Sequence, residues 1–212
     1  LKRSGYQYSD MAVLVRTAFQ TREFEEKFIA EAIPYQVIGG PKFYERQEVR
    51  DLLAYFRVIL QPADDLAFER IINKPARGIG AKSVEKFQDY AREHHISMFD
   101  AVNEMLENDL ISGKSKTALT ELMEHFKEWQ KAAQIVSPDD LAAQVLDDSG
   151  YLDMLKNDKS AEAPGRIENL KELVGVMGDT DNYPTLAEFL EHVSLVMDND
   201  SAVDSNKVLL IT

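Results

Sequence analysis

The periodicity of apolar residues constrains the fold of this chain more than any other feature, because strand-like patterns at both ends enclose a long helical stretch. A valine-rich run at 11–16 predicts a buried strand, residues 21–32 predict a helix, and residues 35–38 predict a second strand. Residues 207–211 return to a strand-like run, and no strand-like alternation is evident between 47 and 198. This order predicts a mainly α chain, in which an all-helical insertion interrupts a partial α/β domain and the chain returns to the same sheet.

Within the enclosed stretch, apolar residues recur at a spacing that places them on one face of a helix. Asp64 or Asp65 is expected to cap the second of these helices. The helical segments run from Val49 to Leu60, Leu66 to Asn73, Val84 to Ala91, Leu119 to Ala133, Pro138 to Leu146, Ile167 to Met177 and Leu186 to Met197.

The same pattern predicts how the chain divides. Residues 1–60 are expected to form the first part of the α/β domain, 61–203 the helical insertion and 204–212 the returning strand. The acidic segment 198–206 is expected to be the return linker. The chain starts at Leu1 and ends in an apolar run, so we expect it to be an internal piece of a longer protein.

Charge is distributed unevenly along the chain. The net charge of −13 argues against nucleic-acid binding by the surface as a whole, because phosphate contacts need Lys and Arg. Residues 70–92, however, contain six basic and two acidic residues, a local charge of +4. Because charges are screened over about 10 Å, such a window can bind DNA on an acidic body. Residues 179–204 contain seven acidic residues and no Lys or Arg, which indicates a solvated face or, alternatively, a protein-docking surface.

The segment from Pro75 to Ser83 (PARGIGAKS) carries the strongest indication of a binding site. Its first glycine can adopt a positive φ, its isoleucine can pack between two helices, and its second glycine lets the backbone approach a partner closely. A helix that begins near Ala81 would present unpaired N–H groups, a positive dipole end and a lysine to a phosphate. The segment is therefore predicted to be a helix-hairpin-helix that binds the DNA backbone without recognising bases. The predicted DNA-binding residues are Arg77, Gly78, Ile79, Gly80, Lys82 and Ser83. The alternative is a tight helix–turn–helix corner with no ligand.

Two segments carry a resemblance to a known family. Val37 to Arg57 (VIGGPKFYERQEVRDLLAYFR) resembles the segment of UvrD/Rep/PcrA-type superfamily 1 DNA helicases that closes the first half of their second RecA-like domain, domain 2A. Asn73 to Gly80 (NKPARGIG) resembles the duplex-contacting hairpin of the helical domain inserted there, domain 2B. Arg166 to Leu170 is a further match, and the resemblance extends over essentially the whole chain.

The resemblance implies functions for both segments. Residues 1–60 and 204–212 would belong to domain 2A and residues 61–203 to domain 2B of an ATP-dependent helicase that moves 3′ to 5′ on DNA. It also implies a motif near the path of single-stranded DNA, formed by Gly39, Gly40, Phe43, Tyr44, Glu45 and Arg46. For Phe43 and Tyr44, core packing is an equally open interpretation.

Neither catalytic residues nor a metal site are predicted in this chain. The family's ATP-binding loop, Gly-x-x-x-x-Gly-Lys-Thr/Ser, is absent from the sequence, so ATP and Mg are expected cofactors of the parent protein and not of this piece. The adjacent His94 and His95 point about 100° apart on a helix, which disfavours shared metal ligation. Trp129 continues the apolar stripe of its helix and is predicted to lie in the core.

The expected partner is DNA at a junction of duplex and single strand. The alternative function is a protein-interaction module that recruits repair or transcription proteins. No apolar run approaches the roughly 20 residues that a membrane helix needs, so no membrane partner is expected. The sequence contains no cysteine, which fits a reducing compartment, and a cytoplasmic location is predicted.

Overall fold

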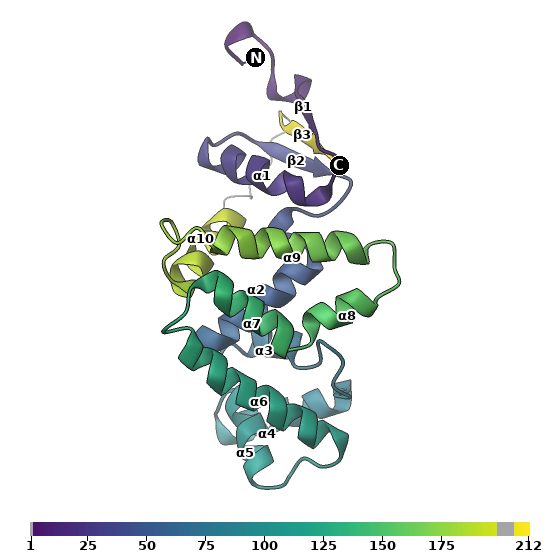
Figure 1. Ribbon diagram of the computed structural model, residues 1–212, viewed down its shortest axis with the longest axis vertical. Helices are drawn as coiled ribbons and strands as arrows, with labels where there is room; N and C mark the ends of the chain where they lie inside the picture. The colour runs from purple at the N-terminus through teal and green to yellow at the C-terminus, as the bar shows by residue number, and fades with distance from the viewer. Residues whose placement is uncertain (1, 199–205) are drawn as a thin grey trace.

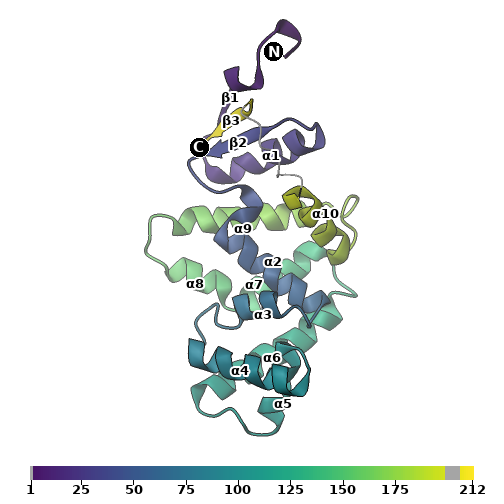
Figure 2. The ribbon, with the colours of Figure 1, turned by 180° about the vertical axis from the view of Figure 1, so that it is seen from behind.

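The computed structural model describes residues 2–198 and 206–212 of the chain. A small α/β unit lies at one end of an elongated molecule, and a larger helical body extends away from it (Figure 1). The view from behind shows the same arrangement, with both chain ends at the α/β unit (Figure 2). The prediction of a helical insertion within a partial α/β unit is therefore confirmed at this level.

The sheet of the described chain has three parallel strands, β1 (Ala12–Leu14), β2 (Tyr35–Ile38) and β3 (Val208–Ile211), in the order β1-β3-β2. The last strand thus lies between the first two, with Leu209 opposite both Ala12 and Gln36. The apolar run of β3 matches this central position, since Val208 and Leu210 are buried and Leu209 and Ile211 are partly buried. The predicted return of the chain to the same sheet is thus observed, whereas the order of the strands was not predicted.

Helix α1 (Thr21–Ala30) packs beside this sheet and completes the α/β unit. Phe28 of α1 contacts Tyr35 of β2 with ring centroids 5.7 Å apart. Four short 3-10 helices also occur in the described residues, at Lys2–Ser4, Tyr8–Asp10, Ala18–Gln20 and Phe43–Glu45.

In the described part of the chain, the helical body contains nine α-helices. They are α2 (Gln47–Leu60), α3 (Asp65–Ile71), α4 (Ala81–His94), α5 (Met98–Glu107), α6 (Lys114–Ala132), α7 (Pro138–Asp148), α8 (Tyr151–Asn157), α9 (Ala163–Met177) and α10 (Leu186–Asp198). Seven of these were predicted from periodicity. Helices α5 and α8 were not predicted. Helix α8 buries only Tyr151 and Leu155 among its 7 residues, whereas α5 has an apolar face that the sequence analysis did not identify.

Local signals explain where these helices begin. Asp64 caps α3 as predicted, because its carboxylate accepts a hydrogen bond from Ala67 N at 3.0 Å. Ser97 caps α5 in the same way by accepting from Asp100 N at 3.1 Å. Pro138 occupies the first turn of α7, where its missing N–H has no consequence.

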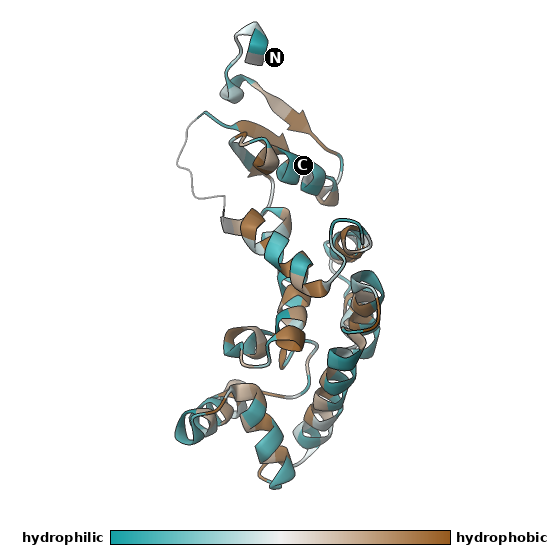
Figure 3. Cartoon of the chain, turned by 90° about the vertical axis from the view of Figure 1, so that its left-hand side faces the viewer, coloured by the Kyte–Doolittle hydropathy of each residue, from teal (hydrophilic) through white to brown (hydrophobic). Residues whose placement is uncertain are grey.

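An aromatic cluster forms the centre of the helical body. Phe126 of α6 lies 5.1 Å from Trp129, 5.5 Å from Phe99 and 6.1 Å from Tyr55, measured between ring centroids. Trp129 is fully buried, which confirms its predicted core position, and its indole N–H donates to Asp148 Oδ2 at 2.9 Å. Figure 3 shows hydrophobic segments along the helices of the body, with hydrophilic residues between them.

Helix α2 runs through the middle of this body and contacts α3, α6, α7, α9 and α10. Its side chains share one continuous core with those helices. The division at residue 60 stays a prediction, and the packing shows that α2 itself is part of the helical core. The predicted return linker lies mostly outside the described residues, since 199–205 are not described. No helix in the described ranges is long and apolar enough to span a membrane.

Candidate nucleic-acid interface

The predicted hairpin forms a tight connection between α3 and α4. Gly78 has a φ of +71°, the positive value predicted for it, and Ile79 is 2% exposed and belongs to the core. Asn73 closes the loop, because its side-chain oxygen accepts from Arg77 N at 2.8 Å and from Ile79 N at 3.2 Å. Helix α4 then begins at Ala81, as predicted.

The outer face of the hairpin is open. Gly78, Gly80 and Lys82 are exposed, and a Cβ atom added at either glycine would meet no atom within 4 Å. No side chain caps α4, and no acidic residue occupies its first turn. The first backbone N–H of the helix with an acceptor is that of Ser83, which donates to Gly80 O at 2.9 Å. Among the described hydrogen bonds, the N–H groups of Ala81 and Lys82 have no acceptor. This face offers backbone donors and a cation to an anion.

Arg77 does not share this outward orientation. Its Nη1 donates to Ile71 O at 2.9 Å and to Ile72 O at 3.2 Å, and its Nη2 donates to the Tyr55 hydroxyl at 2.8 Å. The guanidinium therefore faces the helical body. This orientation does not support the predicted DNA contact of Arg77, because guanidinium donors already committed to protein acceptors are not free for phosphate.

The basic window at 70–92 also offers fewer free cations than its charge of +4 indicated. Arg70 Nε lies 2.7 Å from Asp51 Oδ1, outside hydrogen-bond geometry, and Lys74 Nζ lies 3.2 Å from Asp51 Oδ2. Asp51 is fully buried, so these two cations neutralise a carboxylate that is remote in sequence. Of the six cations in the window, Lys82 and Lys86 are exposed and form no ion pair within the described part of the chain.

The start of α6 lies beside the hairpin, a feature that the sequence did not reveal. Ser115 Oγ donates to Gly78 O at 3.3 Å, and the exposed Lys114 precedes it. Gly113 precedes α6 at a φ of +72°, no acidic residue occupies the first turn, and the sequence Gly113-Lys-Ser-Lys116 resembles that around Gly80. The repeated combination of glycine, lysine and serine was the available signal, but nothing in the sequence placed the two segments together.

The segment predicted to lie near the path of single-stranded DNA contains both buried and exposed residues. Phe43, Tyr44 and Arg46 are buried, whereas Gly39, Gly40 and Glu45 are exposed. The rings of Phe43 and Tyr44 meet edge to face at 5.1 Å, and the Tyr44 hydroxyl donates to Glu26 Oε1 at 2.7 Å. This burial fits the core-packing interpretation of both rings.

Gly39 lies where the chain returns to the sheet. Its φ is +107°, and a Cβ atom added there would lie 2.7 Å from Thr212 Oγ1. Gly39 and Gly40 line a pocket of about 390 Å³ together with Arg166 of α9. Gly39 therefore allows the loop after β2 to pass close to the end of β3, whereas a Cβ atom at Gly40 would meet no atom within 4 Å.

Arg46 joins the α/β unit to the helical body. Its Nη2 donates to Thr21 Oγ1 and its Nη1 to Asn169 Oδ1 of α9, both at 2.8 Å. Asn169 in turn donates to Glu48 Oε1 at 2.5 Å. Burial lowers the pKa of Arg46, and the charges of Glu25 and Glu48 act in the opposite direction. We call Arg46, Thr21, Asn169 and Glu48 the junction network.

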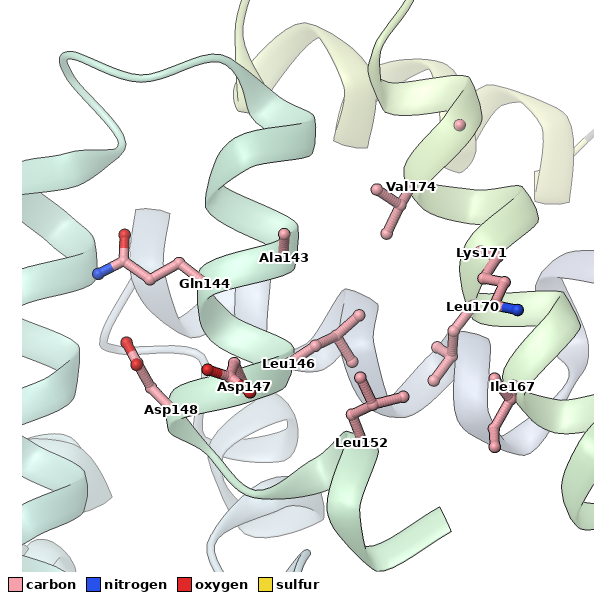
Figure 4. Close-up of a pocket in the computed structure, with 11 residues that line it drawn as sticks. Ala143, Gln144, Leu146, Asp147, Asp148, Leu152, Ile167, Leu170, Lys171 and Val174 are labelled. Atoms are coloured by element: carbon pink, nitrogen blue, oxygen red, sulfur yellow. The ribbon is translucent and has the colours of Figure 1, made fainter. Parts of the chain in front are cut away.

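A separate apolar pocket of about 760 Å³ lies between α7, α8 and α9 (Figure 4). Leu146, Leu152, Leu170 and Val174 contribute to its wall, and the described charged residues that line it are Asp147, Asp148 and Lys171. It contains none of the predicted site residues. The hairpin, and not this pocket, is therefore the candidate site.

Comparison with known proteins agrees with the resemblance. The family model described as the UvrD-like helicase C-terminal domain matches residues 1–212. This chain belongs to the UvrD-like helicase family. Curated relatives include a probable DNA helicase II homolog from Rickettsia conorii, which is 46% identical over 200 residues that cover 94% of this chain and 30% of the relative. The ATP-dependent DNA helicases PcrA of Staphylococcus epidermidis and Staphylococcus aureus are 44% and 41% identical over 219 residues, covering all of this chain and 30% of each relative.

This member of the UvrD-like family thus spans about a third of the length of the relatives it matches. The two segments that carry the sequence resemblance lie at the end of β2 and along α2, and in the hairpin before α4.

Proposed function

We propose that this chain is the duplex-gripping and regulatory part of an ATP-dependent DNA helicase that moves 3′ to 5′. The observation that carries the proposal is the outer face of the hairpin, where exposed Gly78 and Gly80, the free N–H groups of Ala81 and Lys82 and the Lys82 side chain lie together. Such a set of donors suits a phosphate oxygen. Most of its donors are backbone N–H groups, which suit phosphate oxygens and not base edges, so we propose binding that is independent of sequence.

The motor would lie in the rest of the parent protein. This chain has no phosphate-binding loop, and the described residues contain no cluster of three or more His, Cys, Asp or Glu that could hold a metal ion. The residues present therefore do not fit ATP or Mg, and we expect this chain alone to hydrolyse no ATP. Within the segment at 39–46, we propose that the exposed Gly39, Gly40 and Glu45 border the single-strand path.

Replacing Lys82 with alanine tests the phosphate contact. The logarithm of the association constant for DNA falls with the logarithm of salt concentration at a slope of about −0.9 for each phosphate neutralised. We therefore expect Lys82→Ala to weaken duplex binding several-fold and to make this slope less steep by about 0.9. Fluorescence anisotropy of a labelled duplex across a salt series measures both quantities.

Lys27→Ala is the matched control, because Lys27 is an exposed lysine on α1, at the opposite end of the molecule from the hairpin (Figure 1). An equal loss in both variants would show that only the overall charge matters and would contradict the proposed contact. Recruitment of repair or transcription proteins remains the alternative function, and duplex binding that is absent at low salt would favour it.

A further inference from the structure

Hydrogen bonds from the partly buried Arg77 and the buried Tyr55 join the hairpin to the helical body. The Arg77 guanidinium donates to the carbonyls of Ile71 and Ile72, which end α3, and to Ser149 O at 3.4 Å in the turn between α7 and α8. It therefore ties the loop to two separate places in the helical body. A lysine could not make these bonds at once, because they need the planar fork of donors that arginine carries.

The Tyr55 hydroxyl lies at the centre of this arrangement. It accepts from Arg77 Nη2 at 2.8 Å and donates to Lys74 O at 2.5 Å, so it contacts the hairpin at two points. The Tyr55 ring is 1% exposed and is held between Phe126, at 6.1 Å, and Trp129, at 5.8 Å. The aromatic cluster thus fixes the position of the hydroxyl, and the hydroxyl fixes the start of the hairpin.

We propose that Tyr55 and Arg77 are positioning residues for duplex binding, which act by holding the backbone donors of the hairpin in place and not by touching DNA. The inference rests on the proposed function of the hairpin. Its physical basis is preorganisation, because a loop that must be ordered during binding loses affinity. It assigns Arg77 a different role from the phosphate contact predicted by the sequence.

A substitution that removes only the buried Tyr55 hydroxyl distinguishes a positioning role from direct contact with DNA. Tyr55→Phe keeps the ring in its cluster and changes no charge and no surface. The net free energy of one hydrogen bond corresponds to a factor of about two to ten in an equilibrium constant. We therefore expect duplex affinity to fall by that factor, with an unchanged dependence of affinity on salt. Tyr90→Phe is the control, since Tyr90 lies on α4 and its hydroxyl donates only to the Glu104 side chain in the described structure.

Affinity is to be measured well below the melting temperature of every variant, so that unfolding does not contribute to a loss of binding. A role in stability alone would lower the melting temperature and leave affinity at the wild-type value, as in Tyr90→Phe. That result would overturn the proposal.

Arg77→Lys completes the experiment because it keeps the charge and loses the fork. We expect it to weaken binding about as much as Tyr55→Phe, and the double variant to be little weaker than either, since both residues belong to one network. Wild-type affinity in Arg77→Lys, combined with a salt slope less steep by about 0.9 in Arg77→Met, would show a direct phosphate contact and overturn the proposal.

Amide hydrogen exchange gives a readout that needs no DNA. The N–H groups of Arg77 and Ile79 donate to Asn73 Oδ1, and we expect both to exchange faster in Tyr55→Phe but not in Tyr90→Phe. If the wild-type protein binds no duplex but these amides exchange faster in Tyr55→Phe than in wild type, the proposed function fails while the positioning of the hairpin stands. Unchanged exchange would overturn the positioning itself.

Discussion

Replacing Arg46 with methionine is expected to lower the free energy of unfolding by about 3 kcal/mol. Methionine keeps much of the side-chain volume but leaves Thr21 Oγ1 and Asn169 Oδ1 without their donor in a buried place, and each orphaned group costs about 1–3 kcal/mol. It also removes a cation whose charge interacts with the buried carboxylates of Glu25 and Glu48. Urea denaturation measures the loss, and the melting temperature should fall by roughly 10 °C for a chain of this length.

Arg50→Met is the matched control for this prediction. Arg50 lies one turn further along α2, is exposed and should change stability by no more than about 0.5 kcal/mol. We also expect Arg46→Met to speed hydrogen exchange around Asn169, because Arg46 is the donor that joins Asn169 of α9 to Thr21 of α1. Equal stability of the two variants would mean that the junction network contributes nothing to the fold.

Replacing Asp51 with alanine is expected to have the second largest effect, a loss of about 2–3 kcal/mol. Removal of one member of a buried ion pair costs about 3–5 kcal/mol, but Arg70 and Lys74 are 28% and 37% exposed, so water can solvate part of their charge. The Tyr151 hydroxyl, which donates to Asp51 Oδ2 at 2.8 Å, would also lose its acceptor. Denaturant titration should show the loss as a shifted midpoint.

The control for Asp51 is a solvent-exposed ion pair. Asp89 pairs with Arg92 at 2.7 Å, with both side chains more than 60% exposed, and Asp89→Ala should change stability by less than about 1 kcal/mol. Asp51→Asn should lose less than Asp51→Ala, because the amide still accepts from Tyr151. A loss in Asp51→Ala no larger than that in Asp89→Ala would contradict the assignment of Asp51 as a buried anchor.

Much of the fold could be predicted because its signals are local. The apolar runs of β1 and β2, the spacing along α6 and α9 and the cap at Asp64 all depend on residues within a turn or two of one another. The return of the chain to the sheet followed from the apolar run at its end. That β3 would lie between β1 and β2 did not follow, because strand order depends on pairing between residues nearly 200 positions apart.

The candidate site was predicted in outline but not in the orientation of its charges. The glycines of the hairpin, the buried Ile79 and the start of α4 follow from conformational preferences of the chain itself. Arg77 and Lys74 were assumed to be available because they stand in a basic window. Their partners, Tyr55 and Asp51, lie about 20 residues away on α2, and no local pattern identified them.

Helix α2 connects the two parts of the candidate site. At its first turn it carries Glu48 of the junction network, and further along it carries Asp51 and Tyr55, which hold the hairpin. Because one rigid helix carries all three residues, the position of the hairpin is set relative to the α/β unit at which the motor of the parent protein would be attached. The regulation of unwinding that we propose for this chain would have to act through this helix and its junction network.

The central claim is that the outer face of the hairpin grips duplex DNA, and Gly80→Val tests it most directly. A Cβ atom at Gly80 meets nothing within 4 Å and its φ is −87°, so valine should fold normally while its side chain blocks close approach of a phosphate to the backbone. The measurement is anisotropy of a duplex with a 3′ single-stranded tail, titrated with both proteins across a salt series. We predict wild-type binding that weakens steeply with salt and at least about a tenfold loss in the variant. Equal binding by both proteins, or no wild-type binding at low salt, would contradict the account.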